Sequence, residues 1–171
     1  MGKRSAFTRH NRDFYVTPED AVQPLLPHIQ NITTFVEPCA GDGALVEHLH
    51  RRGKYCVDAV DIEPQTNLVR KLDALSLRYC TGQAFITNPP WSRPILHELI
   101  VHLSELAETW FLFDADWMHT KQSQELIKRC KKIVSVGRLK WIPGTKMTGK
   151  DNCAWYLFDN FEDNKTIFIG R

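Results

Sequence analysis

The organisation of the chain is set by the sequence Phe35-Val36-Glu37-Pro38-Cys39-Ala40-Gly41-Asp42-Gly43, in which a short apolar run leads directly into a glycine-rich turn. Residues 33–36 predict a buried strand, and the apolar spacing over 44–52 predicts a helix after the turn. Gly41 and Gly43 allow the backbone to turn tightly and to approach a ligand closely. A strand, a turn and a helix in this order are typical of α/β sheets, in which ligands bind outside the carboxyl ends of the strands.

Strand patterns and amphipathic helix patterns alternate along the rest of the chain. A helix is expected to start at Thr17-Pro18-Glu19-Asp20, where a capping hydroxyl precedes a proline and two acids, and Pro24 should shorten it. Further strands are expected at 55–62, 84–87, 110–113, 133–136 and 154–158, and further helices at 94–107 and 122–130. This alternation predicts an α/β fold of the Rossmann-like kind, with a doubly wound, mostly parallel sheet and helices on both faces.

Length and composition indicate one domain. The 171 residues, 43% of them apolar, suffice for one well-filled core but not for two ordinary domains. We expect a basic, flexible tail over residues 1–12 and a single domain over 13–171. No apolar segment approaches the ~20 residues of a membrane helix, and no apolar secretory region follows the N-terminus.

The cysteines indicate a reducing compartment. They are odd in number and lack the spacing of metal ligands, so we expect reduced thiols, no metal site and a location in the cytoplasm. They are Cys39, Cys56, Cys80, Cys130 and Cys153.

The net charge of +2 conceals an uneven distribution of basic residues. Residues 121–150 carry nine Lys or Arg and one acid, and residues 1–12 carry four bases and no acid. The segment 138–150 also contains Trp141 and two glycines, and aromatic stacking with close backbone approach accompanies nucleic-acid contact. The pattern favours a surface that binds phosphates. A solvated helix face with a flexible tail is the alternative explanation of the same charge.

A glycine-rich turn with a later acid fits two kinds of nucleotide ligand, and a missing glycine and one carboxylate distinguish between them. Asp61 ends the second expected strand, where a carboxylate can accept hydrogen bonds from ribose hydroxyls. The dinucleotide fingerprint requires a third glycine where this chain has Val46. A carboxylate at Glu37, just before the turn, would repel a pyrophosphate but suits a ligand that carries an ammonium and a sulfonium. These residues favour S-adenosylmethionine (SAM) over NAD.

A second motif, Asn88-Pro89-Pro90-Trp91, follows the strand expected at 84–87. In an aromatic amino group such as adenine N6, the lone pair is delocalised into the ring, so a pair of hydrogen-bond acceptors is needed to expose it to a methyl donor. The Asn88 side-chain oxygen and a proline carbonyl can form that pair, and two prolines hold the carbonyls rigidly. Trp91 offers an apolar face to a flat base. An extended Pro-Pro turn followed by a core Trp is the structural alternative.

Four motifs together resemble those of the SAM-dependent DNA adenine-N6 methyltransferases, and in particular the small enzymes of bacteriophages and prophages. They are Phe14-Tyr15-x-Thr17-Pro18, Glu37-Pro-x-Ala-Gly-x-Gly43, Asp61-Ile62-Glu63-Pro64 and Asn88-Pro-Pro-Trp91. The resemblance implies a Rossmann-like methyltransferase fold, SAM as the cofactor and DNA as the partner. Many relatives carry a separate target-recognition region, and this chain has no room for one after Trp91. Specificity is therefore expected to come from short loops or from a partner, or to be relaxed.

The resemblance also implies a role for individual residues. The cofactor would be bound by Tyr15, Thr17, Glu37, Ala40, Gly41, Gly43, Asp61, Ile62 and Asp73. The catalytic set would be Asn88, Pro89, Pro90 and Trp91. The basic segment adds Lys140, Lys146 and Lys150, which together with Trp91 would contact the substrate. Three alternatives remain open: methylation of an RNA adenine, methylation of a protein glutamine amide, and a non-catalytic nucleic-acid-binding module on the same fold.

Overall fold

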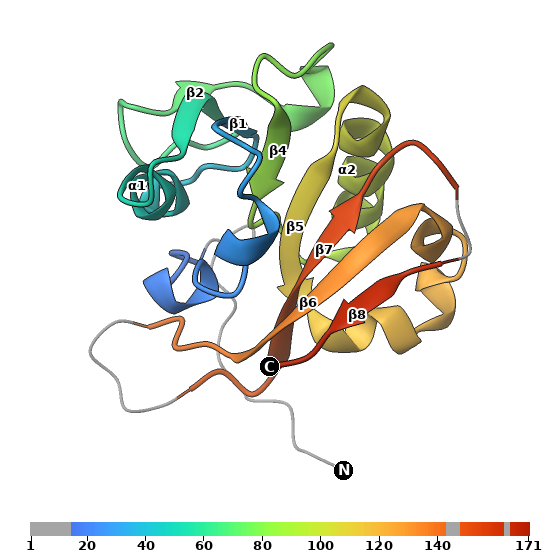
Figure 1. The fold of residues 1–171 in the computed structure, drawn as a ribbon. Helices are drawn as coiled ribbons and strands as arrows, with labels where there is room; N and C mark the ends of the chain where they lie inside the picture. The colour runs from blue at the N-terminus through green and yellow to red at the C-terminus, as the bar shows by residue number, and fades with distance from the viewer. Residues whose placement is uncertain (1–14, 143–147, 163–164) are drawn as a thin grey trace.

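The computed structural model describes residues 15–142, 148–162 and 165–171, so the tail expected over 1–12 lies outside the described residues. In this part of the chain one eight-stranded sheet has the order β3-β2-β1-β4-β5-β7-β6-β8 (Figure 1). The strands are β1 (Thr34–Glu37), β2 (Tyr55–Asp61), β3 (Arg70–Lys71), β4 (Ala84–Thr87), β5 (Thr109–Asp114), β6 (Cys130–Arg138), β7 (Asn152–Phe158) and β8 (Ile167–Ile169).

The strand directions confirm a mostly parallel sheet. Strands β1 to β5 pair in parallel. Strand β7 is antiparallel to both β5 and β6, and β8 is parallel to β6. Strands β6 and β8 therefore run in the same direction as β1 to β5, and β7 runs against them. The carboxyl ends of seven strands consequently share one edge of this described sheet, which we call the carboxyl edge.

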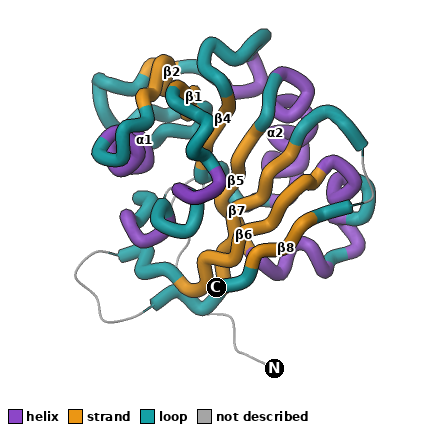
Figure 2. The backbone as a smooth tube through the Cα atoms, in the orientation of Figure 1, coloured by secondary structure: helices purple, strands orange, loops and turns teal. Residues whose placement is uncertain are grey.

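The helical elements are short apart from α2, as the tube in Figure 2 shows. Within the described ranges two are α-helices, α1 (Ala44–His50) and α2 (Arg93–Leu106). The others are 3-10 turns: η2 (Glu19–Ala21), η3 (Leu26–His28), η4 (Ala74–Ser76), η5 (Ala115–His119), η6 (Lys121–Ser123) and η7 (Leu126–Arg129).

The core consists of two buried layers, one on each face of the sheet. Successive strand residues point to opposite faces, so Phe35 packs with the buried leucines of α1 and with the N-terminal 3-10 turns. Its neighbour Val36 packs on the other face with the buried residues of α2 and with Trp117 of η5. The helices lie on both faces, as the sequence predicts, and Figure 1 shows α1 and α2 at opposite sides of the strands.

The helix expected from Thr17 onward is wrong, because the segment forms the 3-10 turns η2 and η3. The N-cap position of η2 is Pro18 and carries no side-chain cap. The Thr17 hydroxyl instead accepts a hydrogen bond from the Asn88 side chain. Pro24 and Pro27 cannot donate backbone hydrogen bonds, so a continuous α-helix is not sustained.

The helix expected over 122–130 is also wrong. Leu126 and Ile127 are its apolar residues, and two adjacent positions do not make a stripe along an α-helix. The Ser123 hydroxyl donates to the Thr120 carbonyl, which stabilises a tight turn instead. The segment forms η6 and η7, and β6 already begins at Cys130.

Two further predictions concern the whole chain. All five cysteines are free thiols, as predicted. Within the described ranges, no helix combines the length and apolar character that crossing a membrane requires. The short edge strands β3 and β8 were not predicted, because two or three residues carry too little periodicity to identify a strand.

Candidate active site

A pocket of about 410 Å³ lies at the carboxyl ends of β1, β2 and β4. This is the position in which a parallel α/β sheet binds its ligands. Most of the residues that the sequence assigned to the site line this pocket: Tyr15, Thr17, Glu37, Ala40, Gly41, Asp61, Ile62, Asp73, Asn88 and Pro90. Segments up to 75 positions apart in the sequence are thus brought to one cavity.

The other assigned residues do not line the pocket. Gly43, at a positive φ of 84°, begins α1 and donates its N–H to the Ala40 carbonyl at 2.7 Å. Pro89 is buried, and Trp91 lies behind Asn88. Lys140 and Lys150 are exposed in the segment between β6 and β7. Lys146 falls outside the described residues.

Several pocket residues were not predicted from the sequence. Ile95, Glu98 and Leu99 of α2 form one wall, and Cys39 and Glu63 extend the two strand-end loops. Ile95 is 46% exposed, although most apolar residues of α2 are buried. Its spacing of three and four residues from Glu98 and Leu99 places all three on one helix face, which is the signal that could have identified this wall.

Asp61 fixes the glycine-rich turn against the end of β2. Its Oδ2 accepts the Gly41 N–H at 2.9 Å, and its Oδ1 accepts the Glu63 N–H at 2.7 Å. Gly41 adopts a positive φ of 54°, a conformation that favours glycine. Because each carboxylate oxygen can accept a second hydrogen bond, Asp61 can hold the turn and still bind a ligand hydroxyl.

Glu37 is a buried carboxyl group with unused hydrogen-bonding capacity. Its side chain is only 1% exposed, and its Oε1 accepts the Cys39 N–H at 3.3 Å. Among the described residues, no donor meets hydrogen-bond geometry at Oε2. Burial raises the pKa of Glu37 to about 8, although the Thr87 hydroxyl and the Cys39 N–H act in the opposite direction. A cationic ligand group at Oε2 would favour the ionised form.

The lining of the pocket is acidic. Among the described residues it contains no Lys, Arg or His, and it carries the carboxyl groups of Glu37, Asp42, Asp61, Glu63, Asp73 and Glu98. A cavity of this charge attracts cations and repels phosphates. It therefore suits a ligand with an ammonium and a sulfonium better than it suits a pyrophosphate.

The Asn88 side chain is held in one orientation by two neighbours. The indole N–H of Trp91 lies 3.3 Å from Oδ1, and Nδ2 lies 3.1 Å from the Thr17 hydroxyl oxygen. Because an indole N–H can only donate, the atom facing Trp91 must be the amide oxygen. That oxygen retains a second lone pair at the pocket, where it can accept a hydrogen bond from a substrate amino group.

Three aromatic rings stand next to Asn88. Trp91 and Trp141 meet edge to face, with ring centroids 5.5 Å apart and an interplanar angle of 86°. Trp141 in turn lies 6.1 Å from the ring of Tyr15, which lines the pocket. Trp141 comes from the segment after β6, so the chain returns to the pocket about 50 residues after the Asn-Pro-Pro-Trp motif.

An ion pair anchors the segment that follows the motif. Arg93 begins α2, and its Nη2 lies 2.9 Å from Oδ2 of Asp114 at the end of β5. The other carboxylate oxygen of Asp114 accepts the N–H of Asp116. Asp114 therefore has a structural role that fixes the end of β4 relative to the end of β5.

The comparisons with known proteins concern the fold. No protein-family model matches the chain, and no curated protein sequence matches it. Solved structures do: one assigned as an RNA methyltransferase from Pyrococcus horikoshii has a TM-score of 0.59 at 18% identity, over 85% of this chain and 86% of that one. Another, assigned as a class I S-adenosylmethionine-dependent methyltransferase from Listeria monocytogenes, has a TM-score of 0.57 at 13% identity, over 91% of this chain and 65% of that one.

A third similar structure is the M protein of the type I restriction enzyme EcoKI, with a TM-score of 0.55 at 12% identity, over 90% of this chain and 46% of that one. The chain thus spans less than two thirds of the Listeria protein and less than half of the EcoKI subunit. At these identities the similarity defines the fold, which is the Rossmann-like fold of SAM-dependent methyltransferases.

Proposed function

We propose that the protein transfers a methyl group from SAM to the exocyclic N6 amino group of adenine in DNA. The observation that carries this proposal is the side-chain amide of Asn88, which lines an acidic pocket and whose orientation Trp91 and Thr17 fix. The fold supports a methyltransferase, and the four sequence motifs support adenine in DNA as the target.

The pocket residues fit SAM. The volume of about 410 Å³ lies within the usual range for small-molecule sites. Glu37 Oε2 would accept a hydrogen bond from the ammonium group, and Asp61 would accept hydrogen bonds from the ribose hydroxyls. Ile62, which is 49% exposed, would pack against the adenine ring of the cofactor. Asp73 uses one oxygen to cap η4 through the Leu75 N–H and has another available for the cofactor's amino group. When bound, SAM supplies an electrophilic methyl carbon.

The Asn88 motif would prepare the nucleophile. The Asn88 oxygen and the carbonyl of Pro89, which is buried between the pocket-lining residues Asn88 and Pro90, would each accept one N–H of the target amino group. The lone pair of that group would then be localised and point at the methyl carbon. A rigid pair of acceptors achieves this by positioning and preorganised dipoles, without a strong base. The target adenine must leave the base stack to reach the pocket, and Trp91 and Trp141 provide aromatic surface where it would arrive.

The substrate class can be tested directly. The protein is incubated with methyl-labelled SAM and, separately, with DNA, RNA and a protein extract, and the nucleic acids are then digested to nucleosides. We expect label in N6-methyldeoxyadenosine and none with an Asn88→Ala variant. Label confined to RNA adenine or to protein glutamine would replace DNA as the substrate, and binding of DNA without any label would indicate a non-catalytic module.

A further inference from the structure

We propose that Arg138, Lys140 and Arg171 form a phosphate-binding surface for the nucleic-acid strand that flanks the target base. This inference rests on the proposed function, because it assigns the backbone contacts of the same substrate. The three residues are exposed and lie at or beyond the carboxyl ends of β6 and β8.

The fold divides the basic segment 121–150 into two separate groups. Arg138 is opposite Asn152 in the register of β6 and β7. The next residue of β7, Cys153, is opposite Asp114 at the end of β5, so Arg138 lies at the carboxyl edge. Lys131 and Lys132 lie at the start of β6, beside the last residues of β7 and the first residue of β8. Arg138 lies seven positions after Lys131 along the strand, or roughly 23 Å at about 3.3 Å per residue. The two groups cannot contact the same short stretch of phosphates.

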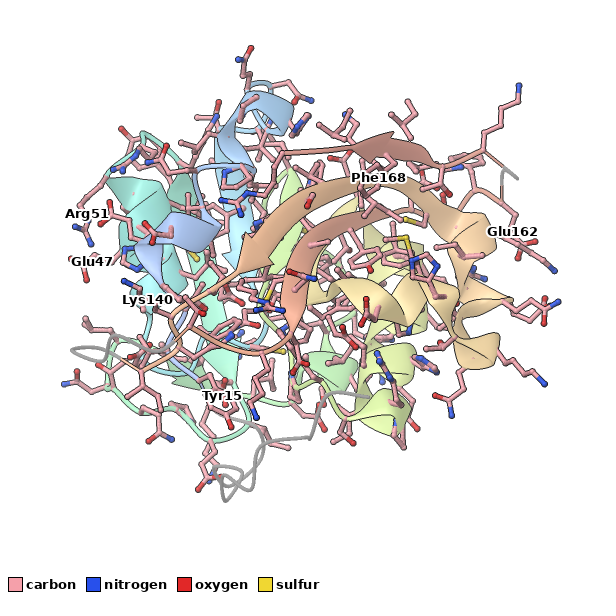
Figure 3. The ribbon with its side chains drawn as sticks, turned by 90° about the horizontal axis from the view of Figure 1, so that it is seen from below. Tyr15, Glu47, Arg51, Lys140, Glu162 and Phe168 are labelled. Atoms are coloured by element: carbon pink, nitrogen blue, oxygen red, sulfur yellow. The ribbon has the colours of Figure 1, made fainter. Side chains whose placement is uncertain are left out.

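The two groups also differ in their partners. At the opposite end of β6, Lys128 pairs with Glu125, Arg129 with Glu105 and Glu162, and Lys131 with Asp159, whereas Lys132 forms no ion pair with a described residue. Among the described residues, Arg138, Lys140 and Arg171 form no ion pair with an acid. In Figure 3, Lys140 and Tyr15 lie toward one side of the molecule, and Glu162 lies toward the other. The charge near the pocket is therefore available for an external anion.

Arg171 joins this surface through a bulge in β6. The register of β6 against β7 shifts between Ser135 and Gly137, and Gly137 has a positive φ of 85°. The Arg171 guanidinium lies over Gly137 so closely that a Cβ there would be 2.6 Å from its Nη1. The missing side chain of Gly137 thus lets Arg171 reach the residue next to Arg138, which gives two guanidinium groups on one edge. Guanidinium groups match phosphate geometry well.

The charge of the pocket explains why phosphates would remain at this rim. The lining is acidic and repels phosphates, whereas an uncharged base can enter. Trp141 follows Lys140 directly and meets both Trp91 and Tyr15, so it connects the basic edge to the pocket. A strand bound by Arg138, Lys140 and Arg171 would therefore present one base to the aromatic rings and keep its backbone outside.

The test compares two triple variants that remove equal charge. Arg138→Ala/Lys140→Ala/Arg171→Ala removes the proposed surface. Lys121→Ala/Lys128→Ala/Lys165→Ala removes three bases elsewhere, of which Lys121 and Lys165 are exposed and Lys128 is partly exposed. Binding of a fluorescein-labelled 20-mer, single-stranded and double-stranded, is measured by anisotropy across a salt series. We expect the first variant to lose at least tenfold in affinity at about 0.1 M salt and to reduce the salt slope by about 2 to 3, since each phosphate contact contributes about 0.7–0.9.

The control variant should bind like the wild type, and an Arg138→Lys/Arg171→Lys variant should retain most of the affinity. SAM affinity, measured by calorimetry, should be equal in all of them, which shows that the pocket is folded. Equal losses in the two triple variants, or no binding of the oligonucleotides by the wild type, would overturn the inference. If the wild type binds DNA through this surface but transfers no methyl group, the proposed function fails while the surface stands. If it methylates DNA with the same KM in the first variant, the function stands and the surface is refuted.

Discussion

The two ends of the sheet satisfy their polar groups in different ways. At the amino end of β6, the bases Lys128, Arg129 and Lys131 are each paired with an acid of the same chain. At the carboxyl edge, Glu37 Oε2 has no partner among the described residues, and Asn88 Oδ1 keeps a lone pair. Groups that a protein leaves unpaired cost stability, so their concentration at one edge marks the place where external molecules complete the pairing.

Among substitutions at the two ends of the sheet, Asn88→Ala should have the largest effect, and the quantity affected is the rate of methylation. The variant loses the proposed amide acceptor and keeps the carboxyl groups that would bind the cofactor, so methylation should fall by at least about 100-fold while SAM affinity stays nearly constant. Turnover and calorimetric titration measure the two quantities. Asn160→Ala, an exposed position just beyond β7, is the matched control and should change neither. Unchanged turnover in the Asn88 variant would refute the catalytic assignment.

Glu37 should make cofactor binding depend on pH. Burial holds the pKa of the free carboxyl at about 8, and a cationic ligand favours the ionised form. Binding therefore releases a proton below that pH, and SAM affinity should rise by about tenfold between pH 6.5 and 8. Calorimetry in this range should show the rise in the wild type and in the exposed control Glu47→Gln, and little of it in Glu37→Gln.

The same group gives a stability prediction with a defined sign. The pKa of Glu37 is higher in the folded protein than in the unfolded chain, so the folded state holds the extra proton. Its contribution to stability is full below the unfolded pKa and is lost as the pH rises through about 8. Without cofactor, Glu37→Gln should consequently lose less stability than the wild type between pH 5 and 8. A denaturant series at several pH values measures this, and parallel curves would contradict the buried, protonated carboxyl.

Trp91→Phe should have a smaller effect than Asn88→Ala. The substitution keeps an aromatic ring and removes the N–H that orients Asn88 at 3.3 Å. The amide would then sample the flipped orientation, and kcat should fall by about fivefold, close to the value of one ordinary hydrogen bond. KM for the nucleic acid should change less than kcat, because the ring is kept. A loss confined to KM would mean that Trp91 acts in stacking alone.

The smallest effect is expected at the other end of the sheet. Glu125→Ala breaks the exposed pair with Lys128, and exposed pairs contribute little to stability. Neither Tm nor DNA affinity should change measurably. A clear gain in DNA affinity on freeing Lys128 would mean that this end also binds nucleic acid, which would weaken the contrast between the two ends.

The sequence predicted the parts of the site that lie within short motifs. Glu37, Gly41, Asp61 and Asn88 each lie at the end of a strand or just after it, so their common edge could be inferred from chain direction alone. Trp141 and Arg171 could not be placed in this way, because their positions depend on the antiparallel return of β7 and on the bulge at Gly137.

The basic segment 121–150 shows the same limit. Its charge was visible in the sequence. Its division into two groups depends on β6, which runs from one end of the sheet to the carboxyl edge. The predicted helices at Thr17 and at 122–130 failed for a local reason, since prolines, Ser123 and a missing apolar stripe favour 3-10 turns. The candidate active site nevertheless lies where sequence and fold agree, at the ends of β1, β2 and β4.

The most direct measurement is a crystal structure of the protein with S-adenosylhomocysteine and an adenine-containing oligonucleotide. The account predicts the cofactor in the acidic pocket, and the N6 atom of one unstacked adenine at about 2.7–3.2 Å from both the Asn88 Oδ1 atom and the Pro89 carbonyl oxygen. An adenine bound elsewhere, or an Asn88 side chain directed away from the sulfur of the cofactor, would contradict it.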